Sequence, residues 1–234
     1  IQIGEGYVIC NDEHGKISFE QALNKSCNCA FAVIAEKLGT QALTETAERI
    51  GFNNTKTLIS EKIYCEKSRI NLSNAKTLDL GWAGIGQYTT LINPCQMLTI
   101  ISSIANGGEA ISPYLMAELI SPKGKVIAMG ESQVAGQYFT ESVASDLNKL
   151  LRSNVKKQYG DSLFPGMEMC GKTGTAEISD DSNKKPNGLF VGYSQREDMP
   201  FAIIVVAEET NSAMSSAVPI ASKVMKAVKT EYTK

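Results

Sequence analysis

The apolar residues of the first fifty positions recur with the spacing of an amphipathic helix. Over residues 18–38 they lie three and four positions apart, Ser18 and Gln21 form a capping box, and Gly39 supplies a stop. Short polar side chains interrupt this stretch at Ser26-Cys27-Asn28. Two interpretations follow: one helix that carries these residues on its outer face, or two helices that break at them and expose both Ser26 and Asn28.

The later part of the chain combines further helical stretches with strands that cluster toward the C-terminus. Helices are predicted over residues 40–50, 93–105, 140–156 and 215–232, and the second opens on Asn93 and Pro94. Strands are predicted over residues 7–10, 115–121, 125–129, 167–170, 188–194 and 201–208. Tight connections between the last strands favour an α+β fold, with an antiparallel sheet covered by helices, over alternating βαβ units.

Length, charge and hydropathy narrow the function classes. The 234 residues include 43% hydrophobic ones, enough for one domain over residues 1–234 with a sizeable core. The net charge of −2 comes without a block of like charges, so no nucleic acid partner is expected. No apolar run approaches the roughly 18 residues of a membrane span. Ile1 resembles an entry into the middle of a domain, so any targeting segment is expected outside these residues.

Six cysteines and one histidine limit the metal and nucleophile chemistry. Cys27 and Cys29 are one residue apart, which matches neither a disulfide framework nor a zinc motif, so small buried apolar roles are expected. His14 lies beside Gly15 in a charged turn, where an exposed residue without a catalytic role is expected. The glycines of residues 81–87 lack the frame of a dinucleotide site. The sequence therefore predicts no metal site, no cofactor and no histidine-based nucleophilic mechanism.

A polar motif follows the strand predicted at 167–170. Residues 171–177 read Gly-Lys-Thr-Gly-Thr-Ala-Glu, so one ammonium, two hydroxyls and two glycines occur where a backbone could approach a ligand. Lysine, threonine and glycine also make ordinary solvated turns. The motif alone therefore does not decide between a binding site at Lys172 and a surface loop.

Three stretches, spread over almost the whole chain, resemble the transpeptidase domain of penicillin-binding proteins. The segment around Ser26 and Asn28 is similar to the S-x-N segment of that family, and residues 85–108 are similar to its glycine–glutamine loop and following helix. Residues 172–177 resemble its K-T-G strand, and residues 189–193 the strand after it. The order and the wide separation of the motifs suit transpeptidases, because β-lactamases usually set them closer.

The resemblance implies a β-lactamase/transpeptidase-like fold with a helical lobe. It implies a serine-type enzyme that cross-links peptidoglycan by acyl transfer from D-Ala-D-Ala stem peptides and is the target of β-lactam antibiotics. Ser26 would relay a proton, Asn28 would hold the peptide carbonyl, and Lys172 would supply positive potential. Thr173 and Thr175 would bind the substrate carboxylate, Thr175 N–H would form half of an oxyanion hole, and Gly174 would admit the substrate backbone.

The same resemblance implies a location and partners. The domain would lie on the extracytoplasmic face of a bacterial cell membrane, anchored by a segment outside these residues. Its expected partners are the stem peptide and β-lactams.

The chain departs from the family pattern at the nucleophile. The S-x-x-K serine of the family precedes S-x-N by several dozen residues, and the 25 residues before Ser26 contain no such motif. Three S-x-x-K strings occur after Ser26, and we interpret them as coincidence: Ser73/Lys76, Ser153/Lys156 and Ser182/Lys185. We therefore expect the C-terminal portion of one transpeptidase domain, incomplete at its N-terminus and inactive alone.

Three hypotheses for the function follow. We favour part of a transpeptidase; the alternatives are a penicillin-sensing receptor domain and a non-catalytic pseudo-enzyme. The gene sequence upstream of Ile1 would separate the first from the last. The first predicts that Ser26 and Asn28 face Lys172 across one groove. It also predicts that a separate upstream polypeptide or another partner fills the place of the S-x-x-K helix, or that the sheet is rearranged and incomplete.

Overall fold

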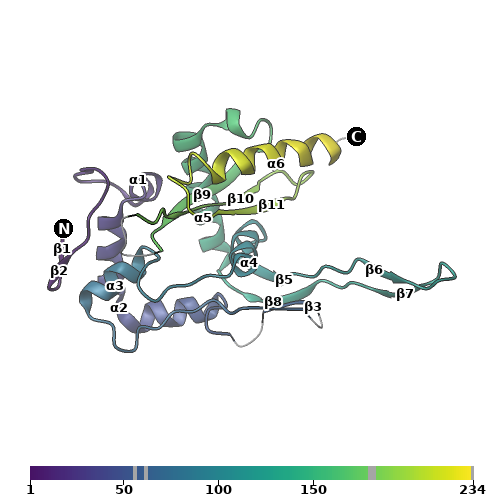
Figure 1. The fold of residues 1–234 in the computed structure, drawn as a ribbon, viewed down its shortest axis with the longest axis horizontal. Coiled ribbons are helices and arrows are strands. Elements are labelled where there is room, and N and C mark those ends of the chain that lie inside the picture. Colours follow the sequence, from purple (N-terminus) through teal and green to yellow (C-terminus); the bar gives the residue numbers. More distant parts are fainter. Residues whose placement is uncertain (55–56, 61–62, 179–182, 233–234) are drawn as a thin grey trace.

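The computed structural model describes residues 1–54, 57–60, 63–178 and 183–232, and it shows helices arranged around antiparallel strands (Figure 1). The α-helices are α1 (Phe19–Asn24), α2 (Asn28–Arg49), α3 (Thr77–Gly84), α4 (Pro94–Ala105), α5 (Glu141–Asn154) and α6 (Ala217–Tyr232). A π-helical turn (Val155–Tyr159) and a 3-10 turn (Asp161–Leu163) follow α5. The strands are β1 (Gln2–Ile3), β2 (Gly6–Tyr7), β3 (Thr57–Ser60), β4 (Ile63–Cys65), β5 (Glu109–Ser112), β6 (Glu118–Ile120), β7 (Val126–Met129), β8 (Gln133–Gln137), β9 (Met169–Ala176), β10 (Asn187–Ser194) and β11 (Ala202–Ala207). The predicted α+β class is confirmed.

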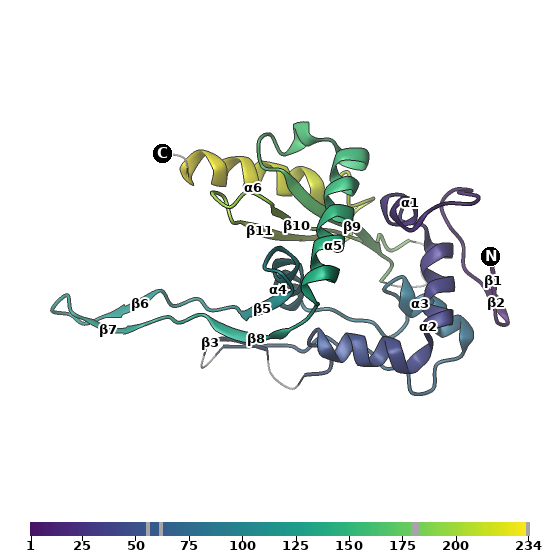
Figure 2. The same ribbon diagram turned by 180° about the vertical axis from the view of Figure 1, so that it is seen from behind.

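The central sheet of the described residues has the strand order β11-β10-β9, and both of its strand pairs are antiparallel. Side chains of β10 alternate between its two faces, as a strand requires. Phe190 is buried in the cluster that includes α6, and Tyr193 is buried with residues of α4 and α5. Figure 2 shows α5 in front of the three strands. Helices therefore cover both faces of the sheet, and β9, the strand that holds Lys172, lies at its edge.

The long helical stretch near the N-terminus is divided twice. The capping box between Ser18 and Gln21 starts α1 as predicted, and the chain breaks before Asn28, where α2 begins. Gly39 has a φ of 77°, so the predicted stop is present as a kink inside the element assigned as α2. The interpretation of two helices broken at the polar residues is confirmed; of the two side chains expected to be exposed there, that of Ser26 is exposed and that of Asn28 is half-buried.

Helix α3 packs closely against α2 because two of its positions are glycines. A Cβ atom added at Gly84 would lie 2.4 Å from the Cβ of Ala35, and one at Gly81 would lie 3.4 Å from the Cβ of Ala32. Larger residues at Gly84 would push the two helices apart. No helix or strand was predicted for the glycine-rich residues 81–87. Residues 81–84 lie in helix α3, where the glycines allow close packing against α2.

Helix α4 begins at the predicted Asn93 cap, whose side-chain oxygen accepts the N–H of Cys95 at 2.8 Å. After β5, the predicted hairpin of β6 and β7 projects as a long arm (Figure 1). Its apolar side chains are largely exposed; Ile127 and Met129 keep 62% and 68% of their surface accessible. The arm therefore has no apolar core of its own.

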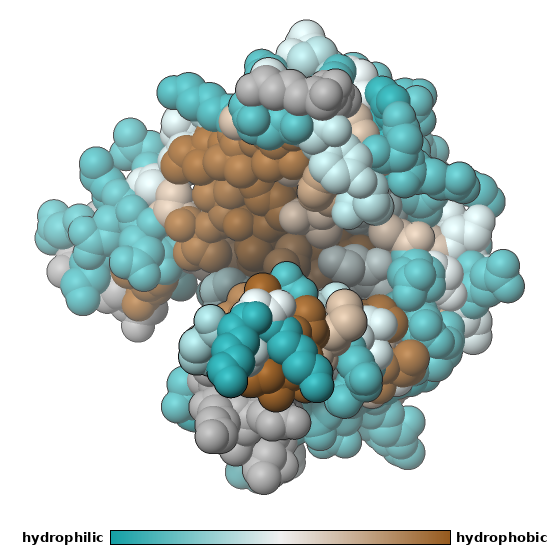
Figure 3. Space-filling model, turned by 90° about the vertical axis from the view of Figure 1, so that its right-hand side faces the viewer, coloured by the Kyte–Doolittle hydropathy of each residue, from teal (hydrophilic) through white to brown (hydrophobic). Residues whose placement is uncertain are grey.

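Apolar residues also gather in a hollow between this arm and α6, seen from the end of the molecule that carries the arm's tip (Figure 3). Strand β11, the outer strand of the described sheet, consists of apolar residues that are only partly buried apart from the exposed Val206. None of the helices in the described part of the chain is long and apolar enough to cross a membrane.

Candidate active site

Ser26 lies at the corner between α1 and α2. Its φ of 49° falls in the left-handed region, which reverses the chain after Lys25, the C-terminal cap of α1. The N–H of Ser26 binds the Leu23 carbonyl at 3.1 Å, and the N–H of Cys27 binds the Ala22 carbonyl at 2.9 Å. These bonds close the corner and leave the Ser26 side chain exposed, outside either helix.

Lys172 reaches Ser26 from strand β9. Its ammonium donates to the hydroxyl oxygen of Ser26 and, at 3.1 Å, to the carbonyl of Thr173. Burial lowers the pKa of Lys172 to about 8, because a desolvated ammonium loses its hydration. At pH 7 a group with that pKa is still about 90% protonated. The structure therefore brings Ser26 and Lys172 together and makes Lys172 a cation at neutral pH.

Asn28 points elsewhere. Its side-chain N–H donates to the carbonyl of Ile9 at 3.1 Å, so its amide holds the N-terminal segment against the start of α2. The expectation that both polar side chains face Lys172 is met by Ser26, whereas the amide N–H of Asn28 is engaged with Ile9. The physical reason is the corner itself, because the chain turns between the two residues.

A cavity of about 190 Å³ lies beside the contact between Ser26 and Lys172. Polar side chains from the corner, from the turn after α5 and from β9 dominate its wall. The lining residues are Asn24, Lys25, Ser26, Gln158, Tyr159, Lys172, Thr173 and Met214. A larger hollow of about 710 Å³, which includes Tyr193 and Arg196 in its wall, shares none of these residues.

Tyr159 is a site residue that the sequence did not indicate. Its hydroxyl accepts the backbone N–H of Thr173 at 2.9 Å and the side-chain N–H of the fully buried Asn154 at 3.0 Å. With both of these bonds accepted, the Tyr159 hydroxyl donates its own proton to the hydroxyl oxygen of Thr173 at 3.0 Å. The Thr173 hydroxyl consequently keeps its proton free for a ligand. Asn154 also donates to the Gly171 carbonyl at 2.7 Å, so both side chains position β9.

Gly174 and Thr175 continue β9 beyond the cavity, and both are exposed. A Cβ atom at Gly174 would meet nothing closer than 3.8 Å, so this glycine is not required by packing. Because β9 is the edge strand of the described sheet, a peptide in extended conformation can approach its outer side.

The later S-x-x-K strings do not supply this site. Ser73 donates to the side chain of Asn71 at 2.7 Å, and Ser153 donates to Glu20 at 2.5 Å. Neither serine lines the cavity, and Ser182 lies outside the described residues.

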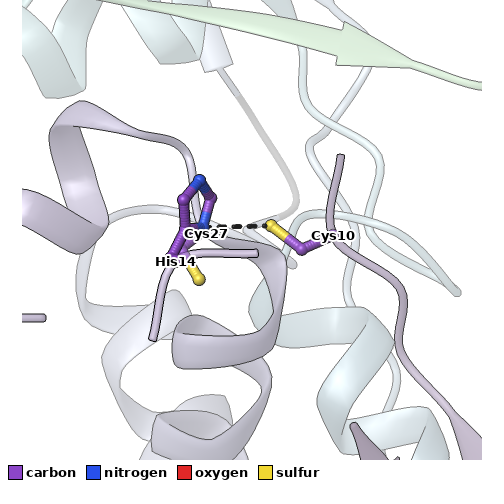
Figure 4. Close-up of side chains that lie close together, drawn as sticks. All are labelled: Cys10, His14 and Cys27. Carbon is purple, nitrogen blue, oxygen red and sulfur yellow. Dashed lines mark hydrogen bonds between the residues drawn. The ribbon is translucent and has the colours of Figure 1, made fainter. Parts of the chain in front are cut away.

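One group of side chains in the described residues could hold a metal, and the sequence did not indicate it. The ligand atoms of Cys10, His14 and Cys27 lie within 4.8 Å of one another (Figure 4). His14, expected to be exposed and without a role, is half-buried, and its Nδ1 lies 3.5 Å from the sulfur of Cys10. The expected exposure was wrong because the N-terminal segment folds back onto the α1–α2 corner.

Comparison with known proteins identifies the family of the chain. The family model described as "Penicillin binding protein transpeptidase domain" matches residues 5–226. The chain is 28% identical over 203 residues to the peptidoglycan D,D-transpeptidase PbpA of Mycolicibacterium smegmatis, a match that covers 86% of the chain and 40% of that protein. It is 25% identical over 222 residues to stage V sporulation protein D of Bacillus subtilis, covering 91% of the chain and 34% of that protein. The chain thus spans well under half the length of these relatives.

Solved structures agree with the sequence matches. The ceftriaxone acyl-enzyme complex of penicillin-binding protein A from M. tuberculosis has a TM-score of 0.84 at 25% identity, covering 91% of this chain and 48% of that one. The D,D-transpeptidase domain of a peptidoglycan glycosyltransferase from Eggerthella lenta has a TM-score of 0.86 at 23% identity, covering 99% and 58%, which shows a shared fold. The chain belongs to the penicillin-binding protein transpeptidase family.

Proposed function

We propose that this chain is part of a serine D,D-transpeptidase that cross-links peptidoglycan outside a bacterial cell membrane and is acylated by β-lactams. The observation that carries the proposal is the contact of the partly desolvated Lys172 ammonium with Ser26, beside a cavity at the edge of β9. The names of PbpA and of the acyl-enzyme complex support the same reaction class. The proposal places the nucleophilic serine outside residues 1–234, since no S-x-x-K motif precedes Ser26.

Ser26 would act as the proton donor to the leaving amine. A lysine ammonium only donates hydrogen bonds, so the oxygen of Ser26 accepts from Lys172 and its own hydroxyl proton remains available. In acyl transfer the bond from the carbonyl carbon to the terminal D-Ala nitrogen breaks, while the same carbon forms a bond to the oxygen of the nucleophilic serine of S-x-x-K. The expelled nitrogen takes the hydroxyl proton of Ser26. The nucleophilic serine loses its own proton to the lysine of S-x-x-K, and that lysine passes a proton back to the Ser26 oxygen.

The residues of β9 would hold the end of the substrate that leaves. The positive charge of Lys172 attracts the terminal carboxylate, and the hydroxyls of Thr173 and Thr175 donate to it. Tyr159 supports this role because it directs its proton to the Thr173 oxygen and leaves the Thr173 proton for the ligand. The N–H of Thr175 would bind the developing oxyanion, and the absence of a side chain at Gly174 admits the peptide backbone. Asn28 would reach the peptide carbonyl once its amide leaves Ile9.

A fluorescent penicillin and a denaturing gel test the proposal. We expect no covalent band with residues 1–234 and a strong band with the protein extended to include the gene-encoded residues before Ile1. In the extended protein, Lys172→Ala should weaken labelling by at least about 100-fold, which is typical for loss of an electrostatic group in the transition state. Lys123→Ala, at an exposed hairpin turn, is the matched control and should label normally. A band from residues 1–234, or full labelling of Lys172→Ala, would contradict the assignment.

A further inference from the structure

The group formed by Cys10, His14 and Cys27 joins two parts of the chain that are separate in sequence. Cys10 and His14 belong to the N-terminal segment, whereas Cys27 is the residue at the corner between Ser26 and Asn28. Figure 4 shows the three side chains close together, with the imidazole ring of His14 facing the sulfur atom of Cys10. All three ligand atoms lie within 4.8 Å of one another.

The separation of Cys10 and His14 matches one edge of a tetrahedral zinc site. With Zn–S of about 2.3 Å and Zn–N of about 2.05 Å, a tetrahedron sets sulfur and nitrogen about 3.6 Å apart and two sulfurs about 3.8 Å apart. The sulfur of Cys10 lies 3.5 Å from the Nδ1 of His14. The other pairs of ligand atoms lie within 4.8 Å of each other, so side-chain adjustments of about 1 Å would bring all three atoms to bonding distance of one ion.

Metal binding would replace the hydrogen bond between Cys10 and His14. Cys27 is the N-cap residue of α2, yet its side chain makes no capping hydrogen bond. It is 5% exposed, while Cys10 and His14 are half-buried, so the group is shielded on one side and open to water on the other. That open side leaves room for a fourth ligand from solvent.

We propose that Cys10, His14 and Cys27 bind one zinc ion, with water as the fourth ligand. Two thiolates and an imidazole are the donors that zinc prefers, whereas calcium and magnesium require oxygen ligands. Binding releases one proton from each thiol and requires the neutral tautomer of His14 with its proton on Nε2.

The ion would act as a cross-link that fixes the corner carrying Ser26. Asn28 and Cys29 already bind the N-terminal segment, through the Ile9 carbonyl at 3.1 Å and the Val8 carbonyl at 3.5 Å. A bond from zinc to Cys27, the neighbour of both Ser26 and Asn28, would add a stronger connection at the same place. This structural role does not depend on the proposed acyl transfer.

Two sulfur atoms this close could instead form a disulfide, in which case His14 would have no part. The test is therefore run on protein purified without an affinity tag, both as isolated and after reduction and removal of the reductant. Zinc content is measured by plasma mass spectrometry, and free thiols are counted by alkylation and peptide mapping. Cobalt is then added to the reduced metal-free protein, since tetrahedral thiolate ligation gives strong sulfur-to-cobalt charge-transfer bands.

We expect one zinc ion per chain and tetrahedral cobalt bands with thiolate character. His14→Ala, Cys10→Ser and Cys27→Ser should each lower zinc affinity by more than about 100-fold, beyond the range typical of residues that only support a ligand. The matched control is Cys65→Ser with Cys95→Ser, because these two thiols also neighbour each other, and it should bind zinc normally. A Cys10–Cys27 disulfide with no cobalt binding after reduction, or equal affinity in His14→Ala and native protein, would overturn the proposal.

Discussion

The Tyr159 hydroxyl and Thr173 are joined twice, through the Thr173 backbone N–H at 2.9 Å and its hydroxyl oxygen at 3.0 Å. A side chain from the turn after α5 thus fixes both the backbone and the hydroxyl of the residue that follows Lys172. This double contact explains how a strand at the edge of the sheet can present a defined hydroxyl rotamer to a ligand.

Replacing Tyr159 by Phe should test this contact. The change leaves the Thr173 N–H without its partner and removes one of the two hydrogen bonds of the buried Asn154 amide, so the free energy of unfolding should fall by about 1–3 kcal/mol. Urea unfolding followed by circular dichroism measures it. Tyr114→Phe, at a tyrosine 49% exposed, is the control and should change stability by less than about 0.5 kcal/mol. Equal effects of the two changes would show that the Tyr159 hydroxyl does not support β9.

Lys172→Met should reveal the cost of burying the ammonium. The folded pKa of Lys172 is about 8 and the unfolded value about 10.4, so between these values the unfolded chain binds more protons. The penalty, roughly 3 kcal/mol, is present in full below pH 8 and disappears as the pH rises toward 10.4. The stability of the variant relative to the native chain should therefore be greatest near pH 7 and fall by pH 10.

Urea midpoints of both proteins at pH 7, 8, 9 and 10 measure this difference. Lys123→Met serves as the exposed control, and its difference from the native chain should not vary with pH. A difference for Lys172→Met that stays constant from pH 7 to pH 10 would contradict the shifted pKa.

Two substitutions of Ser26 separate its backbone from its hydroxyl. The φ of 49° costs a residue with a side chain about 1 kcal/mol and glycine very little, so Ser26→Gly should be more stable than Ser26→Ala by that amount. Both variants lose the contact with Lys172, so both should lose penicillin labelling equally in the extended protein. Labelling retained by either variant would exclude the proton-donor role, while equal stabilities would show that the corner is unstrained.

Two glycines of β9 should respond differently to alanine. A Cβ atom at Gly171 would lie 2.8 Å from both the Phe190 ring and the Val191 carbonyl, whereas one at Gly174 would meet nothing closer than 3.8 Å. Gly171→Ala should therefore cost about 1–3 kcal/mol, and Gly174→Ala less than about 0.5 kcal/mol. Thermal unfolding measures both. Gly174→Ala should still weaken penicillin labelling of the extended protein, because its methyl group would occupy the path of the ligand backbone.

Local signals in the sequence predicted much of the fold. The Asn93–Pro94 start of α4 and the capping box at Ser18 depend on neighbours within four residues, so they could be recognised without tertiary information. Helix α3 could not, because Gly81 and Gly84 disfavour a helix locally and are required only by the approach of α2. Strand β8 was missed because most of its residues are exposed and its pattern does not alternate.

Some residues of the candidate site could likewise be predicted from local sequence, and others could not. Ser26 and Lys172 were found because their motifs are contiguous, and the structure places the two side chains in contact. Tyr159 lies at the end of a π-helical turn, from which its hydroxyl reaches Thr173. The side chains of Cys10 and His14 lie beside that of Cys27 only because the N-terminal segment folds back. No fixed spacing in the sequence predicts these contacts, so a three-dimensional structure was needed to find them.

The projecting arm of β6 and β7 has a consequence for motion. The two strands form a sheet of their own with exposed apolar side chains, and an isolated two-stranded ribbon is marginally stable in water. Its backbone amides should exchange with deuterium far sooner than those that join β9 to β10 in the central sheet, where helices cover both faces. The hydrogen bonds between β6 and β7 can therefore break and re-form many times while those between β9 and β10 stay intact. The arm and the central sheet thus fluctuate as separate cooperative units.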